Sequence, residues 1–298
     1  MSNLLKCWGV RGSQIGDSVA ALSVYAWVRQ QYPQAYTYWQ VARKHIHAVP
    51  LFYNHPLIDQ LVISDCAEGM GPRDIEIAKT CNFRFNTMPE HVPGETWPNL
   101  RSFYAETFRM SDLPEEIYRL MLPELRRPRL TQWFPVERQQ GVIGYWPCAA
   151  YGQTQVIWEN GERVVKSRNA SRPWALALVD RLRAEGYRVV QFGHPNDFAD
   201  SGGGLNVDID ARQRPFMDQI IAANRVDVNI GTDSGAAIVL GAYGVPQVSL
   251  LTNHYPAHTQ NLTAFEPDNP NNISLVGVGS ADSIPLDSVV AAVKQVTS

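Results

Sequence analysis

Short apolar runs alternate with longer amphipathic stretches along most of the chain, and this alternation predicts strands and helices in turn. In the first third, the strands are expected at residues 4–10, 36–41 and 61–63, with a helix at 18–31. Residues 65–135 are less regular, and a stretch of that kind within a domain usually builds a binding surface or lid. The sequence predicts one helix there, from Pro114 to Leu122.

The alternation restarts after a break at residues 135–141. Strands are expected at 142–146, 187–192, 226–230, 247–251 and 273–276, and helices at 173–185, 216–224, 236–243 and 286–296. Such alternation is typical of parallel sheets covered by helices on both faces. The sequence therefore predicts an α/β protein with two Rossmann-like domains, residues 1–137 and residues 138–298.

Composition narrows the classes of function. The 298 residues are 45% hydrophobic and 18% charged, with a net charge of −3, so nothing favours nucleic acid as a partner. The four cysteines are scattered without a CxxC pair, which favours a reducing compartment and no zinc site. No apolar run approaches the length of a signal peptide or membrane span. We expect the protein to lie in the cytoplasm, where peripheral contact with a membrane is compatible with the sequence.

Two glycine-bracketed turns carry the candidate chemistry. The first, residues 11–17, follows the first predicted strand and opens a helix. The N–H groups of a helix's first turn lack partners within the helix, and the helix dipole favours an anion there. Asp17 lies at this point, where its carboxylate either stabilises the helix start or accepts a proton from an attacking hydroxyl.

The second turn is Gly231-Thr232-Asp233-Ser234-Gly235, at the equivalent point of the second domain. Its N–H groups and the Ser234 hydroxyl could hold a diphosphate, or the turn is an ordinary capped helix start. Two such turns, each with an aspartate, suggest a cleft between the domains. Neither turn has the GxGxxG or Walker A sequence, which argues against a dinucleotide or P-loop site.

Three cations, Lys166, Arg168 and Arg172, lie just before the helix expected at 173–185, where they could neutralise a diphosphate. The pair Asp208 and Asp210 matches a metal-binding DxD, but in a strand such carboxylates more often face solvent. Like His254, His194 follows a predicted strand, where loop histidines are common. We therefore predict no metal site.

These motifs, in this order, resemble the GT-B glycosyltransferases and among them the heptosyltransferase-like family, glycosyltransferase family 9. In addition to the second turn, three segments carry the resemblance. They are residues 13–19, which contain Gly16-Asp17, and the segments His55–Leu61 and Gly244–Leu250. It spans most of the chain, and residues 65–135 match least.

The resemblance implies an inverting, metal-independent transfer of a sugar from a nucleotide-diphosphate sugar to a glycan or glycolipid hydroxyl, as in lipopolysaccharide or polysaccharide biosynthesis at the inner face of a membrane. No cofactor is implied. Asp17 would be the catalytic base, and Ser13, Gln14 and Gly16 would lie on the acceptor side. The implied donor-binding residues are Lys166, Arg168, Thr232, Asp233, Ser234, Gly235 and His254.

One departure leaves alternatives open. Where the family usually carries a histidine after the second turn, this chain has Ile238. Another nucleotide sugar than ADP-heptose is then a candidate donor. A nucleotide-sugar 2-epimerase of the same architecture, or a protein that binds sugar nucleotides or glycans without catalysis, would also fit the pattern.

Overall fold

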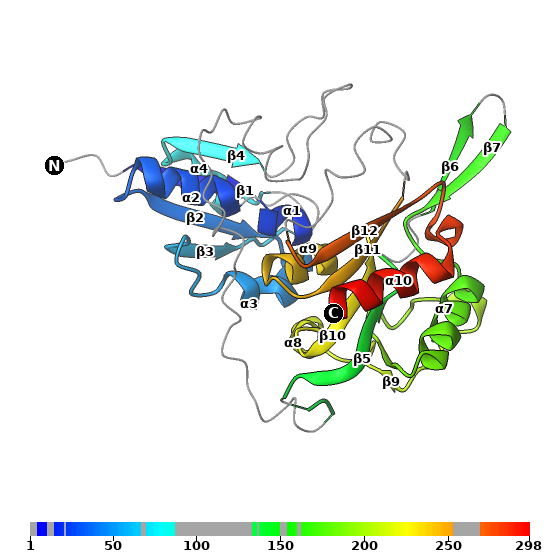
Figure 1. The fold of residues 1–298 in the computed structure, drawn as a ribbon. Helices are drawn as coiled ribbons and strands as arrows, with labels where there is room; N and C mark the ends of the chain where they lie inside the picture. The colour runs from blue at the N-terminus through cyan, green and yellow to red at the C-terminus, as the bar shows by residue number, and fades with distance from the viewer. Residues whose placement is uncertain are drawn as a thin grey trace. The chain divides into compact units, whose positions relative to one another are not determined.

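A computed structural model of the chain describes residues 5–10, 15–20, 22–66, 70–86, 133–135, 137–149, 154–159, 162–252 and 269–298. The described residues form two compact units, one up to Asn86 and one from Trp133 onward. Each unit is built around its own sheet of parallel strands (Figure 1). The predicted α/β class is confirmed. The boundary at residue 137 stays a prediction, because residues 87–132 lie outside the described part.

The first unit holds four parallel strands in the order β3-β2-β1-β4. The strands are β1 Lys6–Val10, β2 Tyr36–Val41, β3 Gln60–Ile63 and β4 Phe83–Asn86. The helices are α1 Ile15–Ala20, α2 Leu22–Gln31, the 3-10 helix η1 Arg43–Ala48, α3 Val49–Phe52 and α4 Pro72–Lys79. Strand β1 is central, and the strand order reverses between β1 and β4.

Aromatic side chains fill the first unit. Trp8 of β1 and Trp39 of β2 are fully buried, and Tyr25 of α2 packs edge-on against Trp39 with ring centroids 5.1 Å apart. The Tyr25 hydroxyl accepts a hydrogen bond from the Gly9 N–H at 2.8 Å and donates one to the carbonyl of Tyr38. This hydroxyl therefore ties α2 to both central strands.

The second unit holds six parallel strands in the order β12-β11-β10-β5-β8-β9, with an antiparallel hairpin, β6-β7, beside them. Its strands are β5 Gln139–Trp146, β6 Thr154–Glu159, β7 Glu162–Ser167, β8 Arg188–Gln191, β9 Ile209–Asp210, β10 Val226–Thr232, β11 Gln247–Thr252 and β12 Asn272–Gly277. Numbered along the unit without the hairpin, the sheet has the order 3-2-1-4-5-6 of a Rossmann fold.

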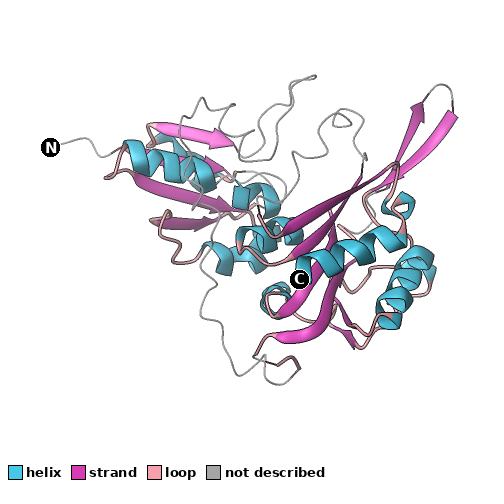
Figure 2. Cartoon of the chain, in the orientation of Figure 1, coloured by secondary structure: helices cyan, strands magenta, loops and turns pink. Residues whose placement is uncertain are grey.

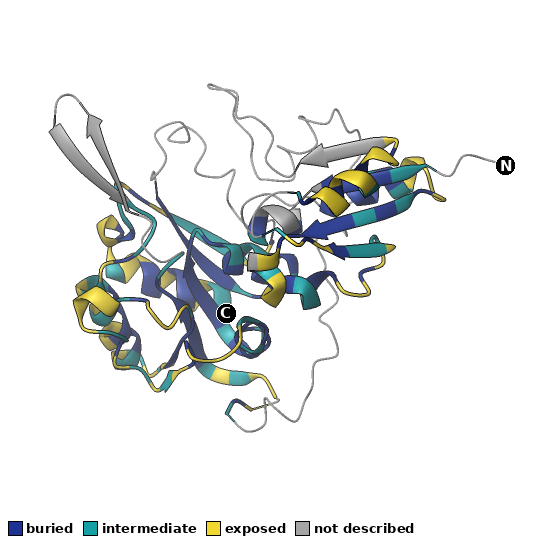
Figure 3. Cartoon of the chain, turned by 180° about the vertical axis from the view of Figure 1, so that it is seen from behind, coloured by how far each residue is buried: buried dark blue, intermediate teal, exposed yellow. Residues whose placement is uncertain are grey.

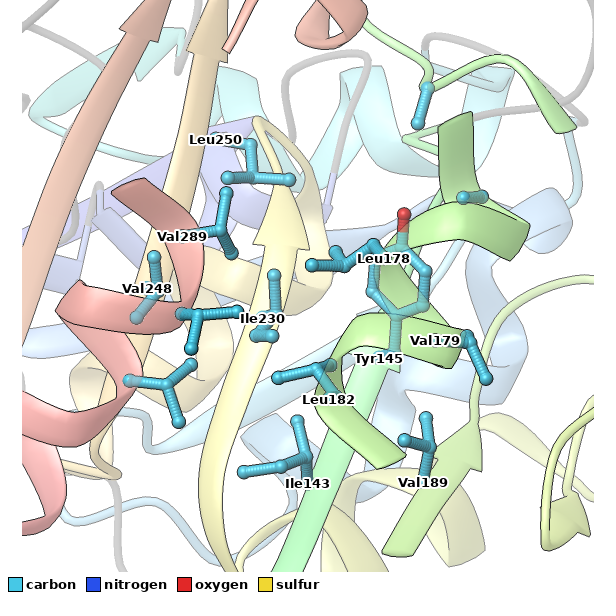
Figure 4. Close-up of a cluster of buried hydrophobic side chains, with 14 of the residues drawn as sticks. Ile143, Tyr145, Leu178, Val179, Leu182, Val189, Ile230, Val248, Leu250 and Val289 are labelled. Carbon is cyan, nitrogen blue, oxygen red and sulfur yellow. The ribbon is translucent and has the colours of Figure 1, made fainter. Parts of the chain in front are cut away.

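Helices cover both faces of this sheet (Figure 2). They are α7 Arg172–Ala184, α8 Phe216–Ala223, α9 Gly235–Ala242 and α10 Leu286–Thr297, with 3-10 turns η3 Ala199–Ser201 and η6 Ala281–Ser283. Alternate residues of the central strands, such as Ile143, Ile230 and Leu250, pack with α7 and α10 in one aliphatic core (Figure 4). Strands β10 and β11 are buried along almost their whole length, whereas the edge strand β12 is mostly half-buried and several positions of α7 and α10 are exposed (Figure 3).

Nearly every element predicted within the described residues is present, with ends shifted by a few positions. The helix expected at 18–31 begins already at Ile15 and is divided into α1 and α2, so Gly16 and Asp17 lie in its first turn. Helix α4 and strand β4 correct the expectation of an irregular region after residue 65. The sequence analysis also missed β9 and the hairpin, whereas the helix expected at 114–122 lies outside the described residues.

Candidate functional site

The second glycine turn lies where the strand order of the second sheet reverses. Strands β5 and β10 are neighbours there. The strands that follow β5 lie on one side of this pair, and those that follow β10 lie on the other side. In open α/β sheets, ligands bind outside the carboxyl ends of the two strands at such a point. Strand β10 ends at Thr232, and Asp233 and Ser234 lead directly into α9.

Ser234 caps helix α9. Its backbone is extended, with φ −150° and ψ 160°, and its Oγ accepts a hydrogen bond from the N–H of Ala237 at 3.3 Å. Because a hydroxyl that accepts one bond can still donate another, Ser234 keeps a donor for a ligand oxygen. Together with the N–H groups of the first turn, it makes the start of α9 able to hold an anion.

Arg168 and Asp233 form an ion pair beside this helix start. Nη1 of Arg168 lies 3.5 Å from Oδ2 of Asp233 and 3.5 Å from its carbonyl oxygen, and both side chains are 11% exposed. Burial raises the pKa of Asp233, and the nearby guanidinium works against that rise. Arg168 is the first residue after β7, so the end of the hairpin places a nearly buried cation beside the end of β10.

Thr232, the last residue of β10, is completely buried. Its hydroxyl has no hydrogen-bond partner among the residues that the structure describes. A buried hydroxyl without a partner carries a desolvation penalty, and its position beside the α9 start makes Thr232 a candidate ligand contact. The structure therefore brings together Arg168 and the predicted residues of the second turn.

The other basic residues of the predicted site have different positions. Lys166 pairs with Gln155 in the hairpin, and its side chain lies outside the described part, as does all of His254. Arg172 begins α7, and its guanidinium donates to the carbonyls of Gly203 and Gly204 at 3.1 and 3.4 Å. Arg172 therefore fastens the loop after β8.

The two aspartates of the DxD pattern are each engaged by arginines. Oδ2 of Asp208 accepts from the N–H of Val189 at 2.8 Å and lies 3.4 Å from Arg183, while Asp210 receives two bonds from Arg212, at 2.9 and 2.7 Å. They anchor strand edges. No group of three metal-ligating side chains occurs within the described ranges.

The first glycine turn lies at the corresponding place in the first sheet. Strand β1 has β2 on one side and β4 on the other, so the strand order reverses at β1. After β1 the chain enters α1. Gly16 and Asp17 are the second and third residues of α1, and Gly16 is buried. The side chain of Asp17, and all of Ser13 and Gln14, lie outside the described residues. A carboxylate in this turn suits both hypotheses made for Asp17.

Sequence reasoning missed the hairpin, which lies between β5 and α7 at the edge of the candidate site. Glu159 pairs with Glu162, so its connection is the two residues Asn160 and Gly161. An Asn-Gly pair between two short segments rich in β-branched and aromatic residues is a strong short-range indication of a hairpin, and could have revealed it.

Comparisons with known proteins extend this picture. No protein-family model and no curated protein matches the chain. Among solved structures, a glycosyl transferase family 9 protein from Veillonella parvula DSM 2008 superposes with a TM-score of 0.65 and 14% identity, covering 100% of this chain and 98% of its own. E. coli ADP-heptose lps heptosyltransferase II gives 0.63 and 18%, covering 98% and 99%.

The structure of E. coli heptosyltransferase WaaC with ADP is also similar, with a TM-score of 0.61 at 10% identity, covering 98% of this chain and 100% of its own. At these identities the comparisons establish a shared fold. The GT-B architecture and the likeness to family 9 that the motifs predicted are thereby confirmed at the level of the fold. No helix of the described part has the length and apolar character needed to cross a membrane.

Proposed function

We propose that the protein is a glycosyltransferase that moves a sugar from a nucleotide-diphosphate sugar to a hydroxyl of a glycan or glycolipid. The observation that carries the proposal is the start of α9, where Ser234 and the Arg168–Asp233 pair converge at the switch point of a Rossmann sheet. The fold shared with heptosyltransferases, one of them in a structure with ADP, supports this choice of donor.

In this proposal, residues 138–298 bind the donor. The diphosphate lies at the start of α9, where the first-turn N–H groups, the Ser234 hydroxyl and the close approach allowed by Gly235 hold its oxygens. The Arg168 guanidinium stabilises the negative charge that grows on the leaving nucleoside diphosphate. Lys166 and His254 are further candidates for phosphate contacts. Because Arg168 supplies positive charge there, we propose a transfer that needs no metal ion.

Residues 1–137 bind the acceptor in the same proposal, with Ser13, Gln14 and Gly16 beside it. Asp17 accepts the proton of the acceptor hydroxyl as its oxygen attacks the anomeric carbon of the sugar. The bond from that carbon to the diphosphate oxygen breaks, and the nucleoside diphosphate leaves with the bonding electron pair. A single displacement of this kind inverts the anomeric configuration. We place the reaction in the cytoplasm, at the inner face of a membrane when the acceptor is a glycolipid.

The experiment compares wild type with Asp17→Asn. Donors are first found by thermal shift with ADP-, GDP-, UDP-, CDP- and TDP-linked sugars, and transfer is then measured over an acceptor panel. We expect Asp17→Asn to lose roughly 10²–10⁴-fold in turnover, with donor affinity unchanged, because only the proton acceptor is removed.

Two outcomes would contradict the proposal. Conversion of a labelled nucleotide sugar without any acceptor would identify an epimerase. Tight binding of a nucleoside diphosphate without turnover over the whole panel would identify a binding protein. Full activity of Asp17→Asn would leave transfer in place and remove Asp17 as the base.

A further inference from the structure

Thr252 extends the candidate site to a second strand. It is the last residue of β11, the neighbour of β10 on the side away from β5. Thr232 pairs with Leu250, so Thr252 lies one strand over and two residues further toward the carboxyl edge. With ordinary parallel-strand spacings, the two threonine Cα atoms are roughly 8 Å apart.

Both threonines lie on the same face of the sheet. Side chains alternate along a strand, and Ile230 and Leu250, two residues before Thr232 and Thr252, belong to the core under α7 and α10 (Figure 4). The side chains of the threonines therefore follow these core residues on that face, at the carboxyl ends of β10 and β11. They form a polar end to an otherwise aliphatic layer.

Among the residues that the structure describes, neither hydroxyl is satisfied. Thr232 is 0% exposed and Thr252 is 8% exposed, and across the described part of the chain neither Oγ1 has a hydrogen-bond partner. The protein does bond such groups elsewhere: the Thr37 hydroxyl donates to the carbonyl of Leu57 at 2.7 Å and the Ser234 hydroxyl caps α9. Two hydroxyls on adjacent strand ends that no described residue bonds are candidates for a partner from outside the chain.

The surroundings define the chemistry of that partner. The α9 helix start and Arg168 provide donors and positive charge beside Thr232, which suits phosphate oxygens. A threonine hydroxyl donates to a phosphate oxygen and both donates to and accepts from a sugar hydroxyl. We propose that Thr252 and Thr232 together bind oxygens of the nucleoside diphosphate donor, Thr252 being a contact that no motif reveals. This inference rests on the proposed function.

The test removes each hydroxyl and keeps the side-chain shape. In Thr252→Val and Thr232→Val we expect the Kd for the tightest-binding of ADP, GDP, UDP, CDP and TDP to rise roughly ten-fold or more, the effect of losing a hydrogen bond to a charged group. Thr252→Ser, which restores a hydroxyl, should recover most of the affinity. The melting temperature of the ligand-free valine variants should stay unchanged or rise, because a methyl group replaces an unbonded hydroxyl.

A matched control is Thr297→Val in α10, whose hydroxyl donates to the Val293 carbonyl at 3.0 Å. It should leave the nucleotide Kd within two-fold of wild type. If wild type binds a nucleoside diphosphate and both site variants bind it equally well, the threonines hold structural water and the inference is wrong. If wild type binds none of the five nucleoside diphosphates, the donor site of the proposed function is wrong, and the inference about the threonines is wrong as well.

Discussion

The buried carboxyl group of Asp74 in the first unit and three buried hydroxyls near one edge of the second sheet differ in their partners, and Asp74 is bonded within the fold. The Asp74 carboxyl group at the start of α4 is 1% exposed. Its Oδ2 accepts hydrogen bonds from the Ser64 hydroxyl at 2.5 Å, the Gly71 N–H at 2.8 Å and the Gln40 amide at 3.2 Å. This network joins β2, the end of β3 and the start of α4, so its task is structural.

The second unit leaves hydroxyls unbonded near one edge of its sheet. Tyr145, Thr232 and Thr252 are buried on the same face of neighbouring strands, and within the described residues none of their hydroxyls has a partner. Trp8 shows that the first unit also holds an unbonded polar atom, its indole nitrogen, although that atom stands in an aromatic core. The partners of a buried group, more than its burial, therefore distinguish a contact that holds the fold from a candidate ligand contact.

The largest expected effect lies in the first unit. Asp74→Ala removes the acceptor that three buried donors share, and we expect the free energy of unfolding to fall by roughly 3–5 kcal/mol. Urea unfolding measures it. The control is Glu76→Ala on the same helix, whose 71% exposed side chain makes a surface ion pair with Lys79 and should cost under about 1 kcal/mol. Equal losses in the two variants would show that the Asp74 network does not hold the unit together.

A second prediction concerns acid, to which one buried group of each unit, His55 and Asp197, should respond in opposite directions. His55 of the first unit is 8% exposed, its Nδ1 accepts from the Leu57 N–H at 3.3 Å, and burial lowers its pKa to about 4. Between pH 6.5 and about 4, His55 is therefore protonated in the unfolded chain but neutral in the folded unit. Stability from this group is lost as the pH falls through that range, by up to roughly 3 kcal/mol.

Asp197 of the second unit has the opposite sign. It is 3% exposed, and burial raises its pKa to about 6, against the effects of the His194 N–H bond and the Arg212 charge. Between about pH 6 and 3.8 the folded unit binds a proton that the unfolded chain lacks, so this group adds stability as the pH falls. Urea unfolding at neutral pH and near pH 4.5 should show a smaller acid loss in His55→Asn and a larger one in Asp197→Asn. Variants with the pH dependence of wild type would refute these assignments.

Hydrophobic periodicity predicted most of the described fold because the sheet strands are buried runs bounded by turns. Strand β2 begins and ends at the residues expected, and β10 and β11 differ from the predictions only at their ends. Strand β4 was missed, although it alternates aromatic and polar residues, because it is only four residues long and lies in the stretch that was interpreted as irregular. The hairpin was missed because its strands are short and the Asn160-Gly161 pair between them in the sequence was not taken as a turn signal.

The candidate site was predicted only where it coincides with a strand-to-helix turn. Asp233 and Ser234 stood out because glycines bracket them, and Arg168 because it precedes a predicted helix. Thr252 carries no such mark. A threonine at a strand end is ordinary in sequence, and only the register of β10 with β11 and the lack of a described partner for its hydroxyl single it out.

The smallest expected effect concerns the third unbonded hydroxyl of the second unit, that of Tyr145. The ring of Tyr145 lies in the aliphatic core, and its residue pairs with Ile230, two positions behind Thr232 (Figure 4). Burial and the nearby Cys148 and Asp282 raise the pKa of Tyr145, so the hydroxyl stays protonated at neutral pH.

Because that hydroxyl is bonded to no described residue, we expect Tyr145→Phe to leave the free energy of unfolding unchanged or to raise it by up to about 1 kcal/mol. Tyr25→Phe removes the same atom from a bonded site and should lose roughly 1–3 kcal/mol. Urea unfolding of both variants, with nucleotide affinity measured beside it, decides the matter. A loss in Tyr145→Phe as large as in Tyr25→Phe would mean that a structural water bonds Tyr145. A weaker affinity without a stability loss would add Tyr145 to the donor site.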